Sequence, residues 1–311
     1  MTKEPRLIPP RKSGALGLFI KSTLHDLQPF LFLQEDLRRF CRITGPVIVS
    51  VPDAHLAKFH RHMMPGHRLV SDGTVARAAN ICWSIRDNWY TQQLVKLCAS
   101  EVMTTEAFLV LDSNTVINAE FDESTFQVDG RWIYEIGDTN KHDLELERRT
   151  CAFLRMNPSQ TLGFRPVNQV FARSELMGLR HYLETVYRAS WGDILYGSCE
   201  CATRLKSALW TEFQLYGAYV TTIAPTHTHA LATKNVLMYF NPSRHLSRLP
   251  ELLSWLAEHQ PFMVKAHRQR PGVRLSARDY MVVATAIRTA CRGGGVAIDK
   301  TFFAKHPLHT R

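Results

Sequence analysis

The chain has 311 residues, of which 45% are hydrophobic and 21% charged. These proportions exclude an intrinsically disordered chain, and the length suits one large α/β domain or two smaller ones. No apolar run reaches the ~18 residues of a membrane span, and the first residues lack the hydrophobic core of a signal peptide, so we expect an intracellular, cytoplasmic protein. The seven cysteines are scattered and do not form the framework of a disulfide-rich domain.

The formal net charge is +10 and the pI is near 9.4. Such a charge favours nucleic acid, anionic lipid headgroups or a polyanionic substrate as partners. Basic residues concentrate in four segments: Arg6–Lys12, Arg38–Arg42, His55–Arg68 and Lys265–Arg278. No helix-turn-helix, zinc-finger or RNA-recognition signature accompanies them. We therefore expect attraction to an anionic membrane surface or glycan in preference to nucleic acid, with a basic surface that has no specific partner as the alternative.

Strands and helices alternate over the first ~120 residues. In chain order the sequence predicts a strand at Ala15–Ile20, a helix at Asp26–Cys41, a strand at Val47–Val51, a short helix at Asp53–His62, a strand at Arg68–Val70, a helix at Asn88–Val102 and a strand from Ala107. This rhythm implies right-handed crossovers and a mostly parallel sheet.

The second half of the chain is predicted to add further elements. These are strands at Trp132–Ile136, Val167–Phe171 and Phe262–Ala266, and helices at Ser174–Tyr187, Trp210–Val220, Leu249–His259 and Ala277–Arg292. We see no internal repeat. The simplest partition is one domain over residues 14–240 with a helical C-terminal extension, 241–311, packed on it.

The segment Ala107–Asn118, AFLVLDSNTVIN, is the most informative stretch. Its continuous apolar run is typical of a parallel strand covered on both faces. Asp112 therefore lies near a carboxyl edge, where open α/β sheets bind ligands, and an Asp-x-Asn sequence there suits a metal ion, a phosphate-bearing metal complex or a sugar hydroxyl. The alternative is an Asx-turn, in which Asp112 and Asn114 bond their own backbone.

Together with the strands Leu16–Ser22 and Val47–Asp53, the segments WYTQQLVKLCASEVMTTEAFLVLDSNTVIN and WTEFQLYGAYV resemble nucleotide-sugar glycosyltransferases of the GT-A fold. More narrowly, they are similar to a bacterial branch of glycosyltransferase-like proteins. The matching positions are Trp89, Tyr90, Gln92, Gln93, Lys96, Asp112, Ser113, Asn114, Glu212, Phe213, Tyr216 and Gly217. The resemblance covers roughly residues 14–240 and implies a mostly parallel α/β sheet flanked by helices.

The resemblance implies that Asp112 anchors a divalent cation, Mn²⁺ or Mg²⁺, that bridges the donor diphosphate. The second carboxylate of the pattern is replaced by Asn114, which brings no negative charge, so weaker metal affinity is expected. Lys96 and Arg86 are candidates to supplement or replace the cation as partners of the diphosphate. For Lys96 the alternative is a solvated lysine on a helix.

Glu212 is the candidate general base of an inverting transfer. Its neighbours Trp210, Phe213 and Tyr216 would desolvate the carboxylate and prepare it to take a proton from the acceptor hydroxyl. Alternatively, Glu212 stabilises the N-terminus of its helix without chemistry. In a retaining transfer, Glu212 would instead orient the acceptor.

Other polar residues are candidates for donor or metal contacts. Gln92 and Gln93 can bond hydroxyls or a base edge, although glutamine is also simply a good helix former. His227 and His229 would share one face of a strand and suit metal or diphosphate contact, although a chance pair is the alternative among 14 histidines. Asp53, at the end of the second strand, could contact a nucleotide ribose or base, or form a turn.

The sequence therefore predicts a GT-A-like glycosyltransferase that moves a sugar from an activated nucleotide to a glycan or glycolipid, at the inner membrane surface. One alternative is a degenerate relative that binds nucleotide or sugar without turnover, a reading favoured by Asn114. A second alternative is a basic nucleic-acid-binding module, which would lose affinity steeply with salt.

Overall fold

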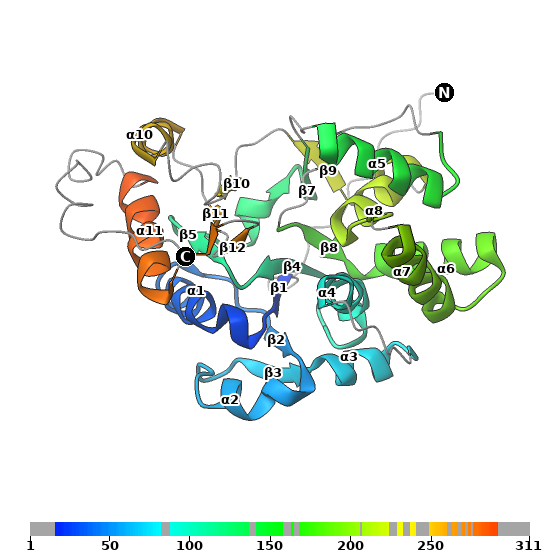
Figure 1. Cartoon of the computed structure of the whole chain (residues 1–311), viewed down its shortest axis with the longest axis horizontal. Helices are drawn as coiled ribbons and strands as arrows, with labels where there is room; N and C mark the ends of the chain where they lie inside the picture. Colours follow the sequence, from blue (N-terminus) through cyan, green and yellow to red (C-terminus); the bar gives the residue numbers. More distant parts are fainter. Residues whose placement is uncertain are drawn as a thin grey trace, which may run out of the picture.

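The computed structural model describes residues 16–81, 88–136, 141–157, 163–164, 168–205, 207–223, 229–232, 237–240, 249–259, 263–266, 269–270, 273–274 and 276–291. Strands and helices alternate in this part of the chain and build an α/β fold around a central sheet, as the sequence predicts (Figure 1). None of the described helices combines the length and the apolar composition needed to cross a bilayer.

The central sheet has five strands in the order β3-β2-β1-β4-β8. Their bounds are β1, Leu16–Lys21; β2, Val47–Val51; β3, Arg68–Ser71; β4, Ala107–Asp112; and β8, Val170–Ala172. The first four strands in this order are parallel, and β8 pairs antiparallel with β4. The prediction of a mostly parallel sheet is therefore confirmed.

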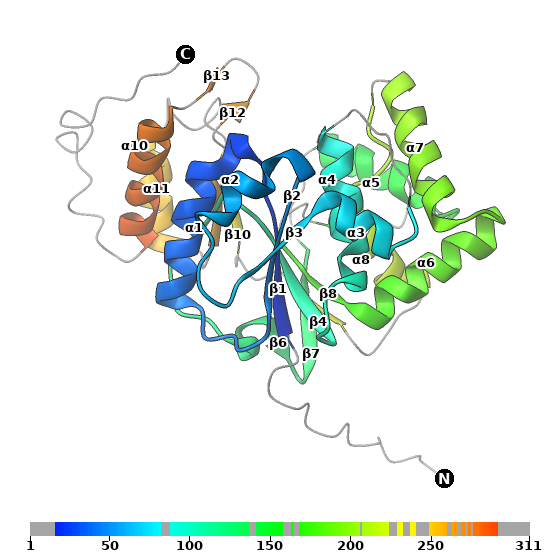
Figure 2. The same ribbon diagram turned by 90° about the horizontal axis from the view of Figure 1, so that it is seen from below.

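The described helices flank this sheet. Their bounds are α1, Leu27–Phe40; α2, Leu56–His60; α3, Asp72–Ala78; α4, Asn88–Leu97; α5, Lys141–Phe153; α6, Arg173–Tyr187; α7, Trp191–Leu205; α8, Glu212–Ala218; α10, Leu249–His259; and α11, Ala277–Cys291. In Figure 2, α1 lies on one side of the central sheet and α3 and α4 lie on the other. The sheet is thus the middle layer of the fold.

Both faces of the sheet are buried, as the apolar run of β4 predicts. Phe108 and Val110 belong to the hydrophobic core on the side of α4, α6 and α8. Leu109 and Leu111 belong to the core on the side of α1 and α2. Because successive side chains of a strand point to opposite faces, one continuous apolar run supplies both cores.

Three helices were not foreseen from the sequence. The short α3 contains Gly73 and α7 contains two glycines, and glycine weakens a helical pattern. In α5, KHDLELERRTCAF, charged residues outnumber the apolar ones, so the apolar face that would indicate an amphipathic helix is small. These helices are stabilised by tertiary packing, which local propensity does not report.

The remaining strands form small sheets. Their bounds are β5, Thr115–Ile117; β6, Gln127–Val128; β7, Arg131–Glu135; β9, His229–Ala232; β10, Leu237–Phe240; β11, Met263–Ala266; β12, Gln269–Arg270; and β13, Val273–Arg274. The strand after the acidic turn, β5, leaves the central sheet and pairs antiparallel with β11, which is parallel to β10. The C-terminal extension therefore shares a sheet with the part of the chain before residue 241.

The helix α11 of the extension packs against α1 and β5. Tyr280 and Ile287 of α11 share a hydrophobic core with Phe32 of α1 and Val116 of β5. The Tyr280 hydroxyl also donates to the carbonyl of Asn114 at 3.5 Å. The extension thus contacts the turn that follows Asp112.

Candidate functional site

Charged and polar side chains gather where the parallel strands end. The strand β1 ends at Lys21, Asp72 follows β3, and β4 ends at Asp112. Lys21 and Asp112 are direct neighbours in the register of β1 and β4. From β1 the strand order runs to β2 and β3 on one side and to β4 on the other. Ligands of open α/β sheets bind at the carboxyl edge beside such a reversal, so this edge is the candidate site.

Lys96 of α4 joins two carboxylates at this edge. Its Nζ lies 2.5 Å from Oδ1 of Asp112 and 2.7 Å from Oε1 of Glu212. The Lys96 and Glu212 side chains are 3% and 2% exposed, whereas that of Asp112 is 12% exposed. We call this group of one ammonium and two carboxylates the Lys96 cluster.

The charge of Lys96 is secured by its partners. Burial by itself lowers the pKa of Lys96, but the two carboxylates outweigh burial and raise the pKa above its ordinary value. The ammonium also lies 5.1 Å from the centre of the Phe213 ring, a cation–π contact. Lys96 is therefore a buried, charged residue, and the alternative of a solvated helix lysine is wrong.

A helix cap and a contact between α4 and α8 bring the cluster together. Oγ1 of Thr211 accepts a hydrogen bond from the Gln214 N–H at 3.1 Å and caps α8. Oε1 of Gln93, on α4, accepts from the Glu212 N–H at 3.2 Å. Gln93 thus binds α4 to the first turn of α8. This contact explains how residues 116 positions apart, Lys96 and Glu212, come to touch.

A closed ring of three hydrogen bonds fixes the backbone of Asp112. The Asp112 N–H donates to Oδ1 of Asn168 at 3.0 Å, and Nδ2 of Asn168 donates to Oγ1 of Thr115 at 2.8 Å. That hydroxyl in turn donates to the Asp112 carbonyl at 2.8 Å. Sequence reasoning missed Asn168 and Thr115. Asn168 is 56 positions from Asp112, so no local pattern could have identified it.

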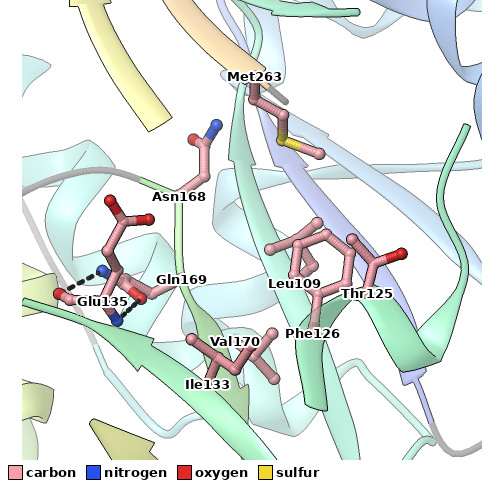
Figure 3. A pocket seen from close by; sticks show the side chains of 9 residues that line it. All are labelled: Leu109, Thr125, Phe126, Ile133, Glu135, Asn168, Gln169, Val170 and Met263. Atoms are coloured by element: carbon pink, nitrogen blue, oxygen red, sulfur yellow. Dashed lines mark hydrogen bonds between the residues drawn. The ribbon is translucent and has the colours of Figure 1, made fainter. Parts of the chain in front are cut away.

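A small cavity lies beside this ring, between β4, β7, β8 and β11 (Figure 3). Thr125, Glu135, Asn168 and Gln169 supply its polar lining, and the side chain of Gln169 bonds the backbone N–H and carbonyl of Glu135. Its volume of about 20 Å³ holds about one water molecule. A nucleotide sugar therefore does not fit there, and the cavity belongs to the support of the site.

Breaking the ring should loosen Asp112. We expect Asn168→Ala to lower the free energy of unfolding by about 1–3 kcal/mol, because it leaves the buried Asp112 N–H without its acceptor. Thr115→Val breaks the same ring, so the double variant should cost less than the sum of the two single variants. Denaturant unfolding of all four proteins measures this coupling, and strictly additive effects would show that the ring does not act as a unit.

A second buried ion pair lies at the ends of β1 and β3. Nζ of Lys21 is 3.1 Å from Oδ2 of Asp72, whose Oδ1 accepts from the Ser50 hydroxyl at 2.7 Å. Burial lowers the pKa of Lys21, Asp72 opposes that change, and the positive charge of Lys96 adds to it. The two buried lysines are therefore close enough to influence one another electrostatically.

Asp53 follows β2 at the same edge and is exposed. Its Oδ2 accepts from the Gly73 N–H at 3.1 Å. A Cβ at position 73 would lie 2.8 Å from Oδ1 of Asp53, so glycine allows this approach. Asp53 thus has a turn-stabilising contact, and its role toward a nucleotide stays a prediction.

The other predicted residues lie in different places. Asn114 and Gln92 are half-buried, the first in the turn after β4 and the second on α4. His229 of β9 is buried, with Nε2 3.3 Å from the Tyr216 hydroxyl and 3.3 Å from the Val170 carbonyl. Arg86 and His227 lie outside the described residues.

The structure does not bring His229 to Asp112. Val170 pairs with Leu109, which precedes Asp112 by three residues on β4, a separation of roughly 10 Å along a strand. The metal-ligand role of His229 stays a prediction that draws no support from this geometry.

Most of the aromatic motif in α8 has a packing role. The ring of Tyr216 lies 4.3 Å from that of Phe171, centre to centre, and its hydroxyl accepts from the Ala172 N–H at 2.8 Å. A Cβ on Gly217 would lie 2.7 Å from the Tyr134 ring, so only glycine allows this contact. In this motif Glu212 supplies one carboxylate of the Lys96 cluster, and the Phe213 ring contacts the Lys96 ammonium.

The donor set at the edge partly suits a divalent cation. Among the described residues no group of three or more His, Cys, Asp or Glu side chains could hold a metal ion. Asp112 has the more exposed carboxylate of the Lys96 cluster, and carboxylate oxygens are ligands that Mg²⁺ and Mn²⁺ prefer. Asp112 and Asn114 could therefore contribute oxygen ligands if phosphates of a donor completed the coordination.

Comparison with known proteins gives one family and a distant structural likeness. A family described as a family of unknown function (DUF6492) matches residues 16–266. The crystal structure of the apo-form glycosyltransferase GlyE in Streptococcus pneumoniae TIGR4 is similar with 9% identity and a TM-score of 0.44. The match covers 94% of this chain and 64% of the GlyE chain. No curated protein matches the sequence.

Proposed function

Because the chain belongs to the family of unknown function DUF6492, we propose its activity from its own site: the transfer of a sugar from a nucleotide donor to a glycan or glycolipid acceptor. The sequence resemblance to GT-A glycosyltransferases supports this proposal. The fold of the described residues agrees with it, but a fold by itself does not define a reaction.

The Lys96 cluster is the observation that carries the proposal. It places a permanent cation and two carboxylates at the carboxyl edge, beside the point where the strand order reverses. Burying three charged groups costs desolvation free energy, which their pairing offsets only in part. Hydrophobic side chains of similar volume at the same positions would often stabilise a protein equally well or better. Such a cluster at a ligand-binding edge is therefore more readily explained by function than by stability.

In the proposed reaction, an acceptor hydroxyl oxygen forms a bond to the anomeric carbon of the sugar. The bond from that carbon to the donor phosphate oxygen breaks, and the nucleoside diphosphate leaves with the electron pair. The hydroxyl proton passes to a base. Mn²⁺ or Mg²⁺, when bound, would neutralise the leaving diphosphate, and we propose Asp112 and Asn114 as its protein ligands.

Two roles are proposed for Glu212. As a general base it would take the proton from the hydroxyl group of the acceptor. As a positioning residue it would hold Lys96 against Asp112. The low exposure of Glu212 and its 2.7 Å contact with Lys96 favour the second role. Glu212→Gln separates them, because loss of a general base typically lowers kcat by 10²–10⁴ and removes one limb of the pH profile, whereas loss of a positioning contact leaves the profile in place.

A thermal-shift screen against nucleoside diphosphates and nucleotide sugars, with and without Mn²⁺, tests donor binding. A ligand at ~100 times its Kd should stabilise the protein by about 2.7 kcal/mol. We expect this shift to disappear in Asp112→Asn and to persist in the control Asp129→Asn, whose carboxylate lies in an exposed turn with 86% side-chain exposure. Release of nucleoside diphosphate in the presence of acceptor then tests turnover.

A binding protein without turnover is the second candidate. The neutral Asn114 and the pairing of Lys96 with two carboxylates favour it, because both reduce the charge available to a leaving diphosphate. It predicts the nucleotide shift without release of nucleoside diphosphate. The absence of a shift with any nucleotide would contradict both candidates.

A further inference from the structure

The segment between Asp53 and Asp72 forms an acid-free basic surface. Residues 54–71 contain no Asp or Glu. Lys58 of α2, Arg61 in the following turn and Arg68 of β3 are all exposed. None of the three has an acidic side chain within 4 Å among the described residues, whereas the exposed Arg38, on α1, lies 2.8 Å from Glu35. The segment therefore presents uncompensated positive charge.

Contacts with α1 hold this surface in place. Nε2 of the buried Gln34, on α1, donates to the His62 carbonyl at 2.6 Å, and its Oε1 accepts from the Met64 N–H at 3.1 Å. Phe59 of α2 is fully buried, with its ring 5.1 Å from that of Phe30. The turn that carries Arg61 is thus ordered by a buried amide and an aromatic anchor. The charges of this surface are preorganised.

The arrangement suits a broad anionic surface. The three cations come from a helix, a turn and the edge strand β3, which lie together at one side of the molecule (Figure 1). Phe59 is the only Phe, Tyr or Trp of the segment, and it is buried, so the exposed rings there are limited to the small imidazoles of His60 and His62. Positive charge without an exposed Phe, Tyr or Trp favours lipid headgroups over single-stranded nucleic acid.

We propose that Lys58, Arg61 and Arg68 form the surface by which the protein binds a membrane that contains anionic phospholipid. His55, at the start of the segment, accepts the Leu24 N–H through Nδ1 at 3.2 Å, so the segment begins at the carboxyl edge of β1 and β2. With this surface on a membrane, the candidate site lies near a lipid-linked acceptor, a consequence that rests on the proposed function.

Vesicle co-sedimentation tests the surface directly. The probes are phosphatidylcholine vesicles with and without phosphatidylglycerol, at low and at physiological ionic strength. We expect binding to the anionic vesicles only, and a weakening by the triple variant K58Q/R61Q/R68Q of roughly 100-fold at low salt, since each Lys or Arg near an anionic surface contributes about fivefold. The control R148Q/R204Q/R278Q removes the same charge from exposed helix positions elsewhere.

Three results would overturn the proposal. They are equal binding to neutral vesicles, equal losses in the two triple variants, and tighter binding of a single-stranded RNA that the K58Q/R61Q/R68Q variant abolishes. Thermal melting confirms that both variants fold. The vesicle assay contains no nucleotide, so it is independent of donor binding. Vesicle binding in the absence of a thermal shift with nucleotides would support the membrane surface and contradict the glycosyltransferase proposal. A nucleotide shift without vesicle binding would contradict the membrane surface alone.

Discussion

Lys96→Met is expected to destabilise the protein by about 3–5 kcal/mol, because it leaves the carboxylates of Asp112 and Glu212 buried without their shared cation. Thermal melting should show a fall in Tm on the order of 10 °C. Lys58→Met, at an exposed position of α2, is the matched control and should leave Tm nearly unchanged.

The stability deficit of the same variant should depend on pH. Because the pKa of Lys96 is raised, its contribution is fully present below the ordinary value of 10.5 and is lost only at more alkaline pH. In Lys96→Met, a proton on one carboxylate relieves the repulsion, so the deficit should shrink between pH 8 and pH 5. A deficit that is constant over this range would show that lost packing, not charge, is responsible.

A neutral cluster should restore stability but not function. Combining Lys96→Met with Asp112→Asn and Glu212→Gln removes all three charges at similar volume, and such replacements are often neutral or stabilising. We expect melting close to that of the natural protein together with loss of the nucleotide shift. Retention of the shift in this triple variant would remove the Lys96 cluster from the proposed site.

Arg288→Met is expected to have a similar effect on stability, about 3–5 kcal/mol, through the C-terminal extension. Arg288 of α11 donates to Oδ1 of the fully buried Asp36, whose Oδ2 accepts from the Ile117 N–H at 3.0 Å. The guanidinium also lies 4.1 Å from the centre of the Phe32 ring. Its loss would leave a buried carboxylate with one backbone donor and weaken the contact of α11 with α1 and β5.

Arg38→Met, on α1 close to Asp36, provides the control. Arg38 pairs with Glu35, next to Asp36, but the side chains of this pair are 63% and 46% exposed. An exposed pair is screened and should contribute little, so denaturant unfolding should separate the two arginine variants clearly. If Arg288→Met unfolded at the same denaturant concentration as Arg38→Met, α11 would not be fixed by this ion pair.

The central strands were predictable because their signal is local. The apolar runs of β1, β2 and β4 and the helical spacing of α1, α4 and α6 lie within the sequence of each element. Asp112 was placed at the end of its strand by the same pattern. The helix α5 could not be predicted in this way, because its buried side becomes apparent only where it packs on its neighbours.

Three residues of the candidate site were selected from the sequence, but their geometry was not predicted. The sequence selected Lys96, Asp112 and Glu212 separately, as a diphosphate partner, a metal anchor and a general base. The structure joins them in one ion cluster. Asn168 and Thr115, which hold the Asp112 backbone, carried no signal, because a hydrogen bond between distant residues leaves no pattern in the chain.

The sequence by itself determined the α/β class, the sheet strands and the acidic end of β4, since hydrophobic periodicity over a few residues specifies which faces are buried. Only the tertiary structure decided which charges meet. The register of β1 and β4, the contact of Gln93 with Glu212 and the crossing of α4 and α8 set distances between residues far apart in the chain. Electrostatic interactions depend on those distances and on burial, and neither is encoded locally.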